Sequence, residues 1–189
     1  MSQPTDSTPA PSSDPDAAEL VVLVDESGAE IGTADKASVH TRTTALHRAF
    51  SCHVFSTDGL VLLTRRALGK LTWPGVWTNS FCGHPAPGEQ LDQAIRRRAE
   101  RELGLTLGGL EPVLPDFRYR AVDASGIVEN EICPVFRTTV EVDPQPADDE
   151  VAEWAWIHPS DLREAVEAAP FAFSPWLVLQ LAEWAEFGA

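Results

Sequence analysis

Short apolar runs alternate with polar segments along most of the chain, and their spacing predicts several strands. Residues 19–24 form a β-branched run that is typical of a short strand. Residues 49–55 and 60–64 predict a hairpin, because the turn sequence Thr-Asp-Gly occupies positions 57–59 between them. Further strands are predicted at residues 116–122, 127–140 and 154–157.

The hydrophobic pattern changes to helical spacing in the middle and at the end of the chain. Residues 89–103 predict a helix that ends at Gly104, with one apolar stripe made of Leu91, Ala94, Ile95, Ala99 and Leu103. Residues 161–168 and 175–187 predict two closing helices, with Ser174 as the N-cap of the second. We therefore expect an α/β (α+β) fold in which helices flank mixed β-sheets.

Composition divides the chain into a tail and one domain. Residues 1–18 are rich in Pro, Ser and Asp and have no apolar periodicity, so we predict a disordered N-terminal tail. Residues 19–189 are long enough for one hydrophobic core and predict a single domain. Within it, residues 69–87 carry few regular signals and predict a long loop, which is where functional groups usually gather.

Charge and cysteine content limit the possible partners and compartment. A formal net charge of −15 argues against binding to nucleic acid or to an anionic membrane. No apolar run reaches the roughly 18 residues of a membrane span, and no signal peptide is apparent. Three sparsely placed cysteines favour a reducing cytoplasm. We expect a monomer or weak homodimer whose partner is a small molecule; if that molecule is anionic, the scarce cations must gather at its site.

Candidate chemistry is concentrated in two short segments. In the first, Cys82 and His84 are separated only by Gly83, within the predicted loop. In the second, Glu129 and Glu131 are two positions apart, so on a strand their side chains share one face. A thiol, an imidazole and a carboxylate pair together indicate a metal site with acid and base groups.

The predicted helix resembles the Nudix box, G-x5-E-x7-R-E-U-x-E-E-x-G-U. Two positions depart from the pattern, since Arg98 and Arg101 stand where the box has glutamates that hold magnesium for hydrolysis. The positions that fit are Gly83, Glu89, Arg97, Glu102, Gly104 and Leu105. From residue 19 to 187 the chain is similar to one branch of that superfamily, the type I isopentenyl-diphosphate delta-isomerases. The segments that carry this resemblance are 64–67 (TRRA), 73–80 (WPGVWTNS), 82–85 (CGHP), 117–120 (FRYR), 126–133 (GIVENEIC) and 173–176 (FSPW).

The resemblance implies two metal sites and a set of phosphate contacts. The ligands of one zinc or manganese ion would be His40, His47, His84, Glu129 and Glu131. A magnesium ion would join the substrate diphosphate to Glu102 and to the main-chain carbonyl of Cys82. The phosphate contacts would be Lys36, Arg66, Lys70 and Arg98, which include both lysines of the chain.

The resemblance also implies a reaction, the interconversion of isopentenyl diphosphate and dimethylallyl diphosphate by antarafacial proton transfer through a carbocation-like intermediate. Cys82 and Glu131 would exchange the two protons, Tyr119 would assist Glu131, and the face of Trp176 would attract the cation.

Other interpretations of the same residues are possible. A Nudix diphosphohydrolase would need the complete glutamate cluster, and a non-catalytic Nudix module would not need Cys82, Tyr119 and Glu131 together. Cys133 is a rival thiol on the same predicted strand, where a packing role is favoured, and Trp176 could be an ordinary core residue.

Overall fold

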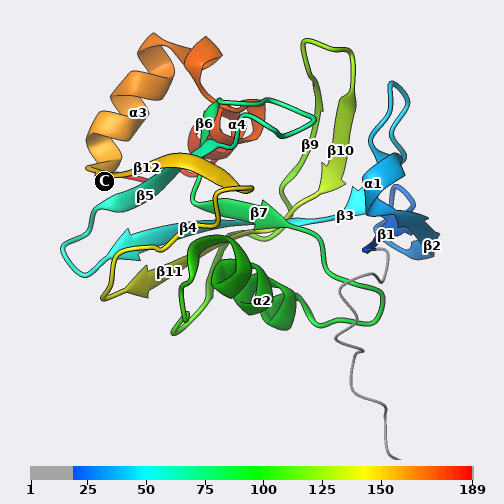
Figure 1. Ribbon diagram of the computed structural model, residues 1–189, viewed down its shortest axis with the longest axis horizontal. Coiled ribbons are helices and arrows are strands. Elements are labelled where there is room, and N and C mark those ends of the chain that lie inside the picture. Colours follow the sequence, from blue (N-terminus) through cyan, green and yellow to red (C-terminus); the bar gives the residue numbers. More distant parts are fainter. Residues whose placement is uncertain (1–18, 189) are drawn as a thin grey trace, which may run out of the picture.

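Two mixed β-sheets form the framework of the protein (Figure 1). A computed structural model describes residues 19–188, so the tail predicted at 1–18 lies outside the described residues. The first sheet has the order β2 (Glu30–Asp35), β1 (Leu20–Val24), β3 (His47–Arg48), β10 (Val128–Ile132) and β9 (Arg118–Val122). The second has the order β12 (Val151–Ile157), β5 (Val61–Arg66), β4 (Phe50–Ser56), β11 (Val135–Val140) and β8 (Glu111–Leu114), with β6 (Trp77–Thr78) paired to β5 and β7 (Phe81–Gly83) paired to β4.

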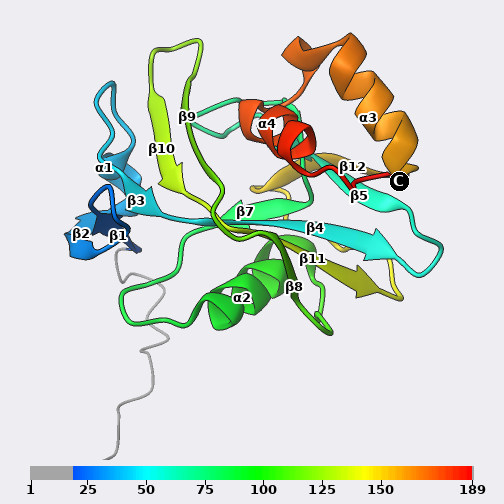
Figure 2. The same ribbon diagram turned by 180° about the vertical axis from the view of Figure 1, so that it is seen from behind.

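Helices lie on both sides of the second sheet, and views from the front and from behind agree on this (Figures 1 and 2). One side carries α2 (Leu91–Leu103), and the other carries α3 (Pro159–Ala168), η1 (Pro170–Ala172) and α4 (Pro175–Glu183). Strand β5 serves both cores because successive side chains point to opposite faces: Leu62 packs in the core of α2, whereas Val61 and Leu63 pack in the core of α3 and α4. This confirms the predicted α+β class.

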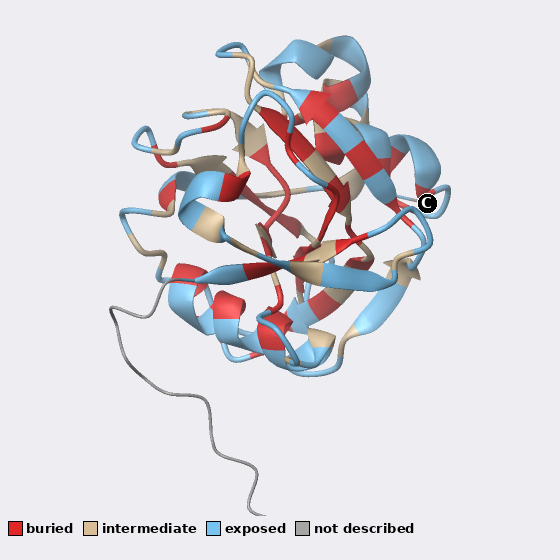
Figure 3. Ribbon diagram, turned by 90° about the vertical axis from the view of Figure 1, so that its right-hand side faces the viewer, coloured by how far each residue is buried: buried red, intermediate tan, exposed pale blue. Residues whose placement is uncertain are grey.

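Buried residues gather in the interior, between the strands and the inner faces of the helices (Figure 3). Helix α2 follows the predicted stripe, since Ala94, Ile95, Ala99 and Leu103 are all fully buried. It ends at Gly104, which has a φ of 63°. Its buried face also carries Arg98 and Glu102, two charged side chains that point toward a cavity described below.

The prediction of a single strand at residues 127–140 is wrong, because this segment is divided between the two sheets. Strand β10 ends at Ile132 in the first sheet and β11 begins at Val135 in the second. Pro134 stands between them and has no N–H for a ladder. The neighbouring segment, which runs parallel to it, also leaves the first sheet after β3 and enters the second as β4. Glu131 therefore pairs with His47 in the first sheet, and Val135 pairs with Ser51 in the second. These two crossing segments bring His47 and Glu131 together.

Several short elements were absent from the prediction. Strands β6 and β7 lie inside the segment expected to be a loop at 69–87, and β2, β8 and the four-residue helix α1 (Lys36–Val39) were also missed. Apart from β2, which has six residues but only one large apolar side chain, Ile31, these elements have two to four residues and carry too little periodicity to be predicted, because long-range pairing forms them. The last helix, α4, stops at Glu183, four residues before the predicted end. Within residues 19–188, no helix has the length and apolar character needed to cross a membrane.

Candidate active site

One cavity of about 550 Å³ collects the chemistry-bearing residues of the chain. Its walls come from α1, β5, β7, α2, β9, β10 and the start of α4, so it depends on both sheets. Every site residue expected from the sequence lines this cavity except His47, which is fully buried behind the wall. The rival thiol Cys133 is also fully buried and is not part of the lining.

Three imidazoles and one carboxylate form a compact cluster at one end of the cavity. Ligand atoms of His40, His47, His84 and Glu131 all lie within 4.8 Å of one another. Glu131 Oε1 lies 3.0 Å from His84 Nε2 and 3.4 Å from His47 Nε2. Glu129 stands beside this cluster rather than in it: its Oε2 lies 3.0 Å from His40 Nε2, and its Oε1 accepts a hydrogen bond from Thr72.

The cluster fits a divalent metal ion on two observations. His40 Nε2 and His47 Nε2 are buried and, among residues 19–188, make no hydrogen bond of good geometry, although a carboxylate oxygen lies within 3.4 Å of each. His47 Nδ1 lies 2.9 Å from the carbonyl of Ala45, which can only accept, so in the neutral ring the proton is on Nδ1 and the lone pair is on Nε2. Imidazole nitrogens with a carboxylate oxygen suit a borderline ion such as zinc or manganese.

The environment keeps Glu131 ionised and Tyr119 protonated. Burial alone would raise the pKa of Glu131, but the imidazoles of His47 and His84 beside its carboxylate, when protonated, hold that pKa well below its usual value. Tyr119 pairs directly with Glu131 between β9 and β10. Burial and the negative charge of Glu131 raise the pKa of Tyr119 well above its usual value, so its hydroxyl can act as a donor near that carboxylate.

Cys82 is half-buried at the centre of β7 and lines the cavity. Desolvation raises the pKa of its thiol to about 12, so the thiol is protonated at neutral pH. Its Sγ lies 3.4 Å from Ser51 Oγ and 3.4 Å from Asn79 Oδ1. Neither Ser51 nor Asn79 was selected as a site residue from the sequence, because neither carries a charge and their contacts with Cys82 form only in the folded chain.

Aromatic side chains form a second wall. Trp176 is 3% exposed and follows Ser174, whose hydroxyl caps α4 by accepting from Leu177 N–H. The ring of Trp176 lies 5.8 Å from that of Tyr119 and 5.3 Å from that of Trp73. The guanidinium of Arg66 lies 5.4 Å from the Trp176 ring centroid, so one indole face already meets a positive charge.

The cavity is also lined by cations that are paired with carboxylates. Lys36 contacts Glu19, Lys70 contacts Glu150, and Arg98 contacts Glu102 one helical turn along α2. Glu150 also lies 3.4 Å from Arg98. Glu19 and Glu150 were missed from the sequence, because nothing there shows that distant acidic residues meet these cations.

Comparison with known proteins decides the family. The chain matches the NUDIX domain over residues 45–177. Three curated relatives are named isopentenyl-diphosphate Delta-isomerase: those of Agromyces mediolanus (66% identical, covering 90% of this chain and 83% of the relative), Clavibacter sepedonicus (65%, covering 88% of each) and Corynebacterium glutamicum (56%, covering 86% and 89%). The chain belongs to the isopentenyl-diphosphate Delta-isomerase family.

Solved structures show that this isomerase family member has the fold of Nudix proteins. A crystal structure from Deinococcus radiodurans has a TM-score of 0.71 and 18% identity, covering 89% of this chain and all of that one. A MutT protein from Methanosarcina mazei has a TM-score of 0.59 and 18% identity, covering 74% and 92%. At these identities the likeness concerns the fold alone.

Within this family member, the Nudix-box residues act on the loop that leads from β7 into α2. Arg97 makes two hydrogen bonds of 2.8 Å to Glu89, and Glu89 accepts a third from Ala86 N–H. Arg97 also donates to the carbonyl of His84 at 3.3 Å. At Gly83, a Cβ atom would come within 3 Å of Phe50 and Arg98, so only glycine allows α2 to pack this closely. These contacts fix the position of His84.

Proposed function

We propose that this protein interconverts isopentenyl diphosphate and dimethylallyl diphosphate by moving one proton onto, and another off, the carbon skeleton. One observation carries the proposal: the Cys82 thiol, the Glu131 carboxylate and the buried Trp176 indole share one cavity, and four cations also line it. Moving an unactivated double bond requires an acid, a base and stabilisation of a tertiary cation. The cavity offers a group for each requirement.

Cys82 and Glu131 are the proton-transfer pair in this proposal. The thiol of Cys82 holds its proton at neutral pH and can donate it, whereas Glu131 is ionised and can accept one. The hydroxyl of Tyr119, opposite Glu131, is a hydrogen-bond donor that would help to position the carboxylate. Placed on opposite faces of a flat substrate, the two groups would give antarafacial transfer.

Two ions complete the proposed site. Zinc or manganese on His40, His47, His84 and Glu131, with Glu129 as a neighbouring ligand, would neutralise charge and fix the orientation of Glu131. Magnesium bound with the diphosphate would neutralise phosphate charge, held by Glu102 and the main-chain carbonyl of Cys82.

Lys36, Arg66, Lys70 and Arg98 would bind the diphosphate. In the structure, three of them contact carboxylates, so substrate would replace Glu19 and Glu150 as their partner. The exchange reconciles a charge of −15 with an anionic substrate, because the cations are concentrated in one place. The Trp176 face would stabilise the cation, since a desolvated indole attracts positive charge by about 2 kcal/mol. We expect a cytoplasmic monomer or weak homodimer without nucleic-acid or membrane partners.

The test is to incubate purified protein with isopentenyl diphosphate, magnesium and manganese and to follow the mixture by proton and phosphorus NMR. The proposal predicts that dimethylallyl diphosphate accumulates to an equilibrium while the diphosphate stays intact. Release of phosphate from this substrate, or from nucleoside diphosphate derivatives, without isomerisation would favour a Nudix diphosphohydrolase instead.

A further inference from the structure

We propose that Asn79 is a positioning residue that holds the Cys82 thiol and the Trp176 indole in a fixed relation to each other, with Ser51 as its partner. The inference rests on the proposed function, because it concerns how two groups of that reaction are placed. Asn79, Ser51 and Gln180 are all fully buried and none of them lines the cavity, so they would act through the residues that do.

A single amide touches both groups. Asn79 Oδ1 accepts a hydrogen bond of 2.9 Å from Trp176 Nε1, and Cys82 Sγ lies 3.4 Å from both Oδ1 and Nδ2. Trp176 is 97 residues away in the sequence and belongs to α4, whereas Cys82 belongs to β7. Asn79 is therefore a direct physical link between the proposed proton donor and the proposed cation-stabilising ring.

The orientation of this amide is determined by its neighbours. Indole Nε1 can only donate and the carbonyl of Phe81 can only accept, so Oδ1 faces Trp176 and Nδ2 donates to Phe81 at 2.8 Å. Nδ2 gives its other proton to Ser51 Oγ at 2.8 Å, and Thr78 Oγ1 donates to Oδ1 at 2.9 Å. With all four bonds made, rotation of the amide would break several buried hydrogen bonds at once.

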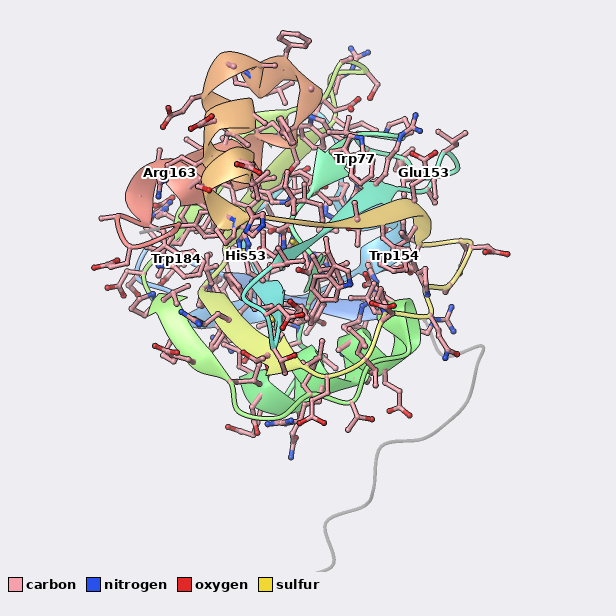
Figure 4. All side chains as sticks on the ribbon, turned by 90° about the vertical axis from the view of Figure 1, so that its left-hand side faces the viewer. His53, Trp77, Glu153, Trp154, Arg163 and Trp184 are labelled. Carbon is pink, nitrogen blue, oxygen red and sulfur yellow. The ribbon has the colours of Figure 1, made fainter. Side chains whose placement is uncertain are left out.

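Ser51 supports the thiol from a second side. Its hydroxyl lies 3.4 Å from Cys82 Sγ and 3.3 Å from Gln180 Oε1, which in turn contacts His53 Nε2 at 2.9 Å. His53 is fully buried and packs edge-on against Trp184, with a centroid distance of 5.5 Å; both residues are labelled in Figure 4. The thiol thus stands against a hydrogen-bonded chain that continues into the core rather than against mobile surface groups.

Such a network would matter for turnover more than for substrate binding. The hydrogen bonds of Asn79 and Ser51 reach Cys82 and Trp176, whereas three of the four proposed diphosphate-binding cations, Lys36, Lys70 and Arg98, contact carboxylates instead. A misplacement of about 1 Å at the reacting centre can cost about 100-fold in rate. Loss of the network should therefore lower kcat and leave KM nearly unchanged.

The test compares Asn79→Ala and Ser51→Ala with a matched control, Ser80→Ala. Ser80 is also buried and makes two hydrogen bonds of 2.7 Å, from Val54 N–H and to the carbonyl of Leu62, but no hydrogen bond joins it to Cys82 or Trp176. For each variant with its metals bound, kcat, KM and the thermal midpoint are measured, and kcat is expressed per folded molecule.

We expect kcat to fall about 100-fold in Asn79→Ala and about tenfold in Ser51→Ala, with KM within about threefold of wild type in both. Ser80→Ala should lose stability but keep kcat within about twofold. In a double-mutant cycle, the fold-loss of kcat in the double variant Asn79→Ala/Trp176→Phe should be smaller than the product of the two single fold-losses. The reason is that Asn79→Ala already removes the hydrogen bond that holds the Trp176 ring.

Equal kcat per folded molecule in Ser51→Ala and Ser80→Ala would contradict the proposal. So would a double variant whose fold-loss of kcat equals the product of the losses in Asn79→Ala and Trp176→Phe. Should Asn79→Ala not fold, Ser51→Ala and its control still decide the question. Wild-type turnover in the same assay reports on the proposed function separately, since it does not depend on any of these variants.

Discussion

His53 provides a stability prediction that can be worked out from the structure. It is fully buried, and desolvation lowers its pKa from 6.5 to about 4, although its hydrogen bond with Gln180 opposes this shift. The unfolded chain therefore binds more protons at this site than the folded chain between these two pKa values. Stability from the neutral imidazole is complete above pH 6.5 and is lost as the pH falls toward 4.

The size of the effect follows from the two pKa values. Each pKa unit between the folded and the unfolded chain corresponds to about 1.4 kcal/mol of stability. Between pH 6.5 and pH 5 the unfolded chain takes up a proton at this site while the folded chain stays largely neutral, so stability falls steeply there. Integrating proton uptake over that interval gives a loss of about 2 kcal/mol in the free energy of unfolding at pH 5. His53→Gln removes the titrating group and keeps a hydrogen-bond donor for Gln180.

The assay is urea unfolding at pH 7 and pH 5, with and without metal chelator, for wild type and His53→Gln. The variant should be less stable at pH 7 but should lose about 2 kcal/mol less than wild type on going to pH 5. The control is His158→Gln, which changes an exposed histidine and should keep the wild-type dependence. Equal losses in wild type and His53→Gln would refute the buried neutral state of His53.

Three further predictions concern the proposed site. Cys82→Ser should lose nearly all isomerisation, measured by NMR, while it keeps its metal; normal turnover in Cys82→Ser together with inactive Cys133→Ser would reverse the choice of thiol. His84→Ala should lose the transition metal by elemental analysis and unfold at a lower temperature, because folding assembles the ligand cluster; unchanged metal stoichiometry would contradict this. Trp176→Phe should keep measurable kcat and Trp176→Leu should lose far more, because only Phe keeps a negative ring face; a Leu variant with wild-type kcat per folded molecule would remove the indole from the mechanism.

The regular elements could be predicted from the sequence wherever their periodicity was long. The stripe from Leu91 to Leu103 specified α2, and the turn at residues 57–59 specified the β4–β5 hairpin. The division of residues 127–140 between two sheets could not be predicted, because it depends on the neighbouring segment that crosses with it at His47 and Ser51. Pro134 was the local signal of that break.

The candidate site followed the same rule. Residues within recognisable motifs were selected from the sequence, and the structure brings them to one cavity. Asn79 lies inside one of those motifs, but its contacts with Cys82 and Trp176 depend on how β7 meets α4. Glu19 and Glu150 lie outside every motif and become relevant only through contacts with Lys36 and Lys70. Such pairings depend on tertiary structure, so spacing along the chain does not reveal them.

In the proposed mechanism two groups, the Cys82 thiol and the Glu131 carboxylate, transfer different protons. The most direct test is to run the reaction of isopentenyl diphosphate in deuterium oxide and to measure deuterium in the new methyl group of dimethylallyl diphosphate at early times. We expect one solvent-derived deuterium per product molecule, because the thiol exchanges its proton with solvent before it donates. Product that carries no solvent deuterium would mean that one group moves the substrate's own proton, which would contradict the two-group mechanism.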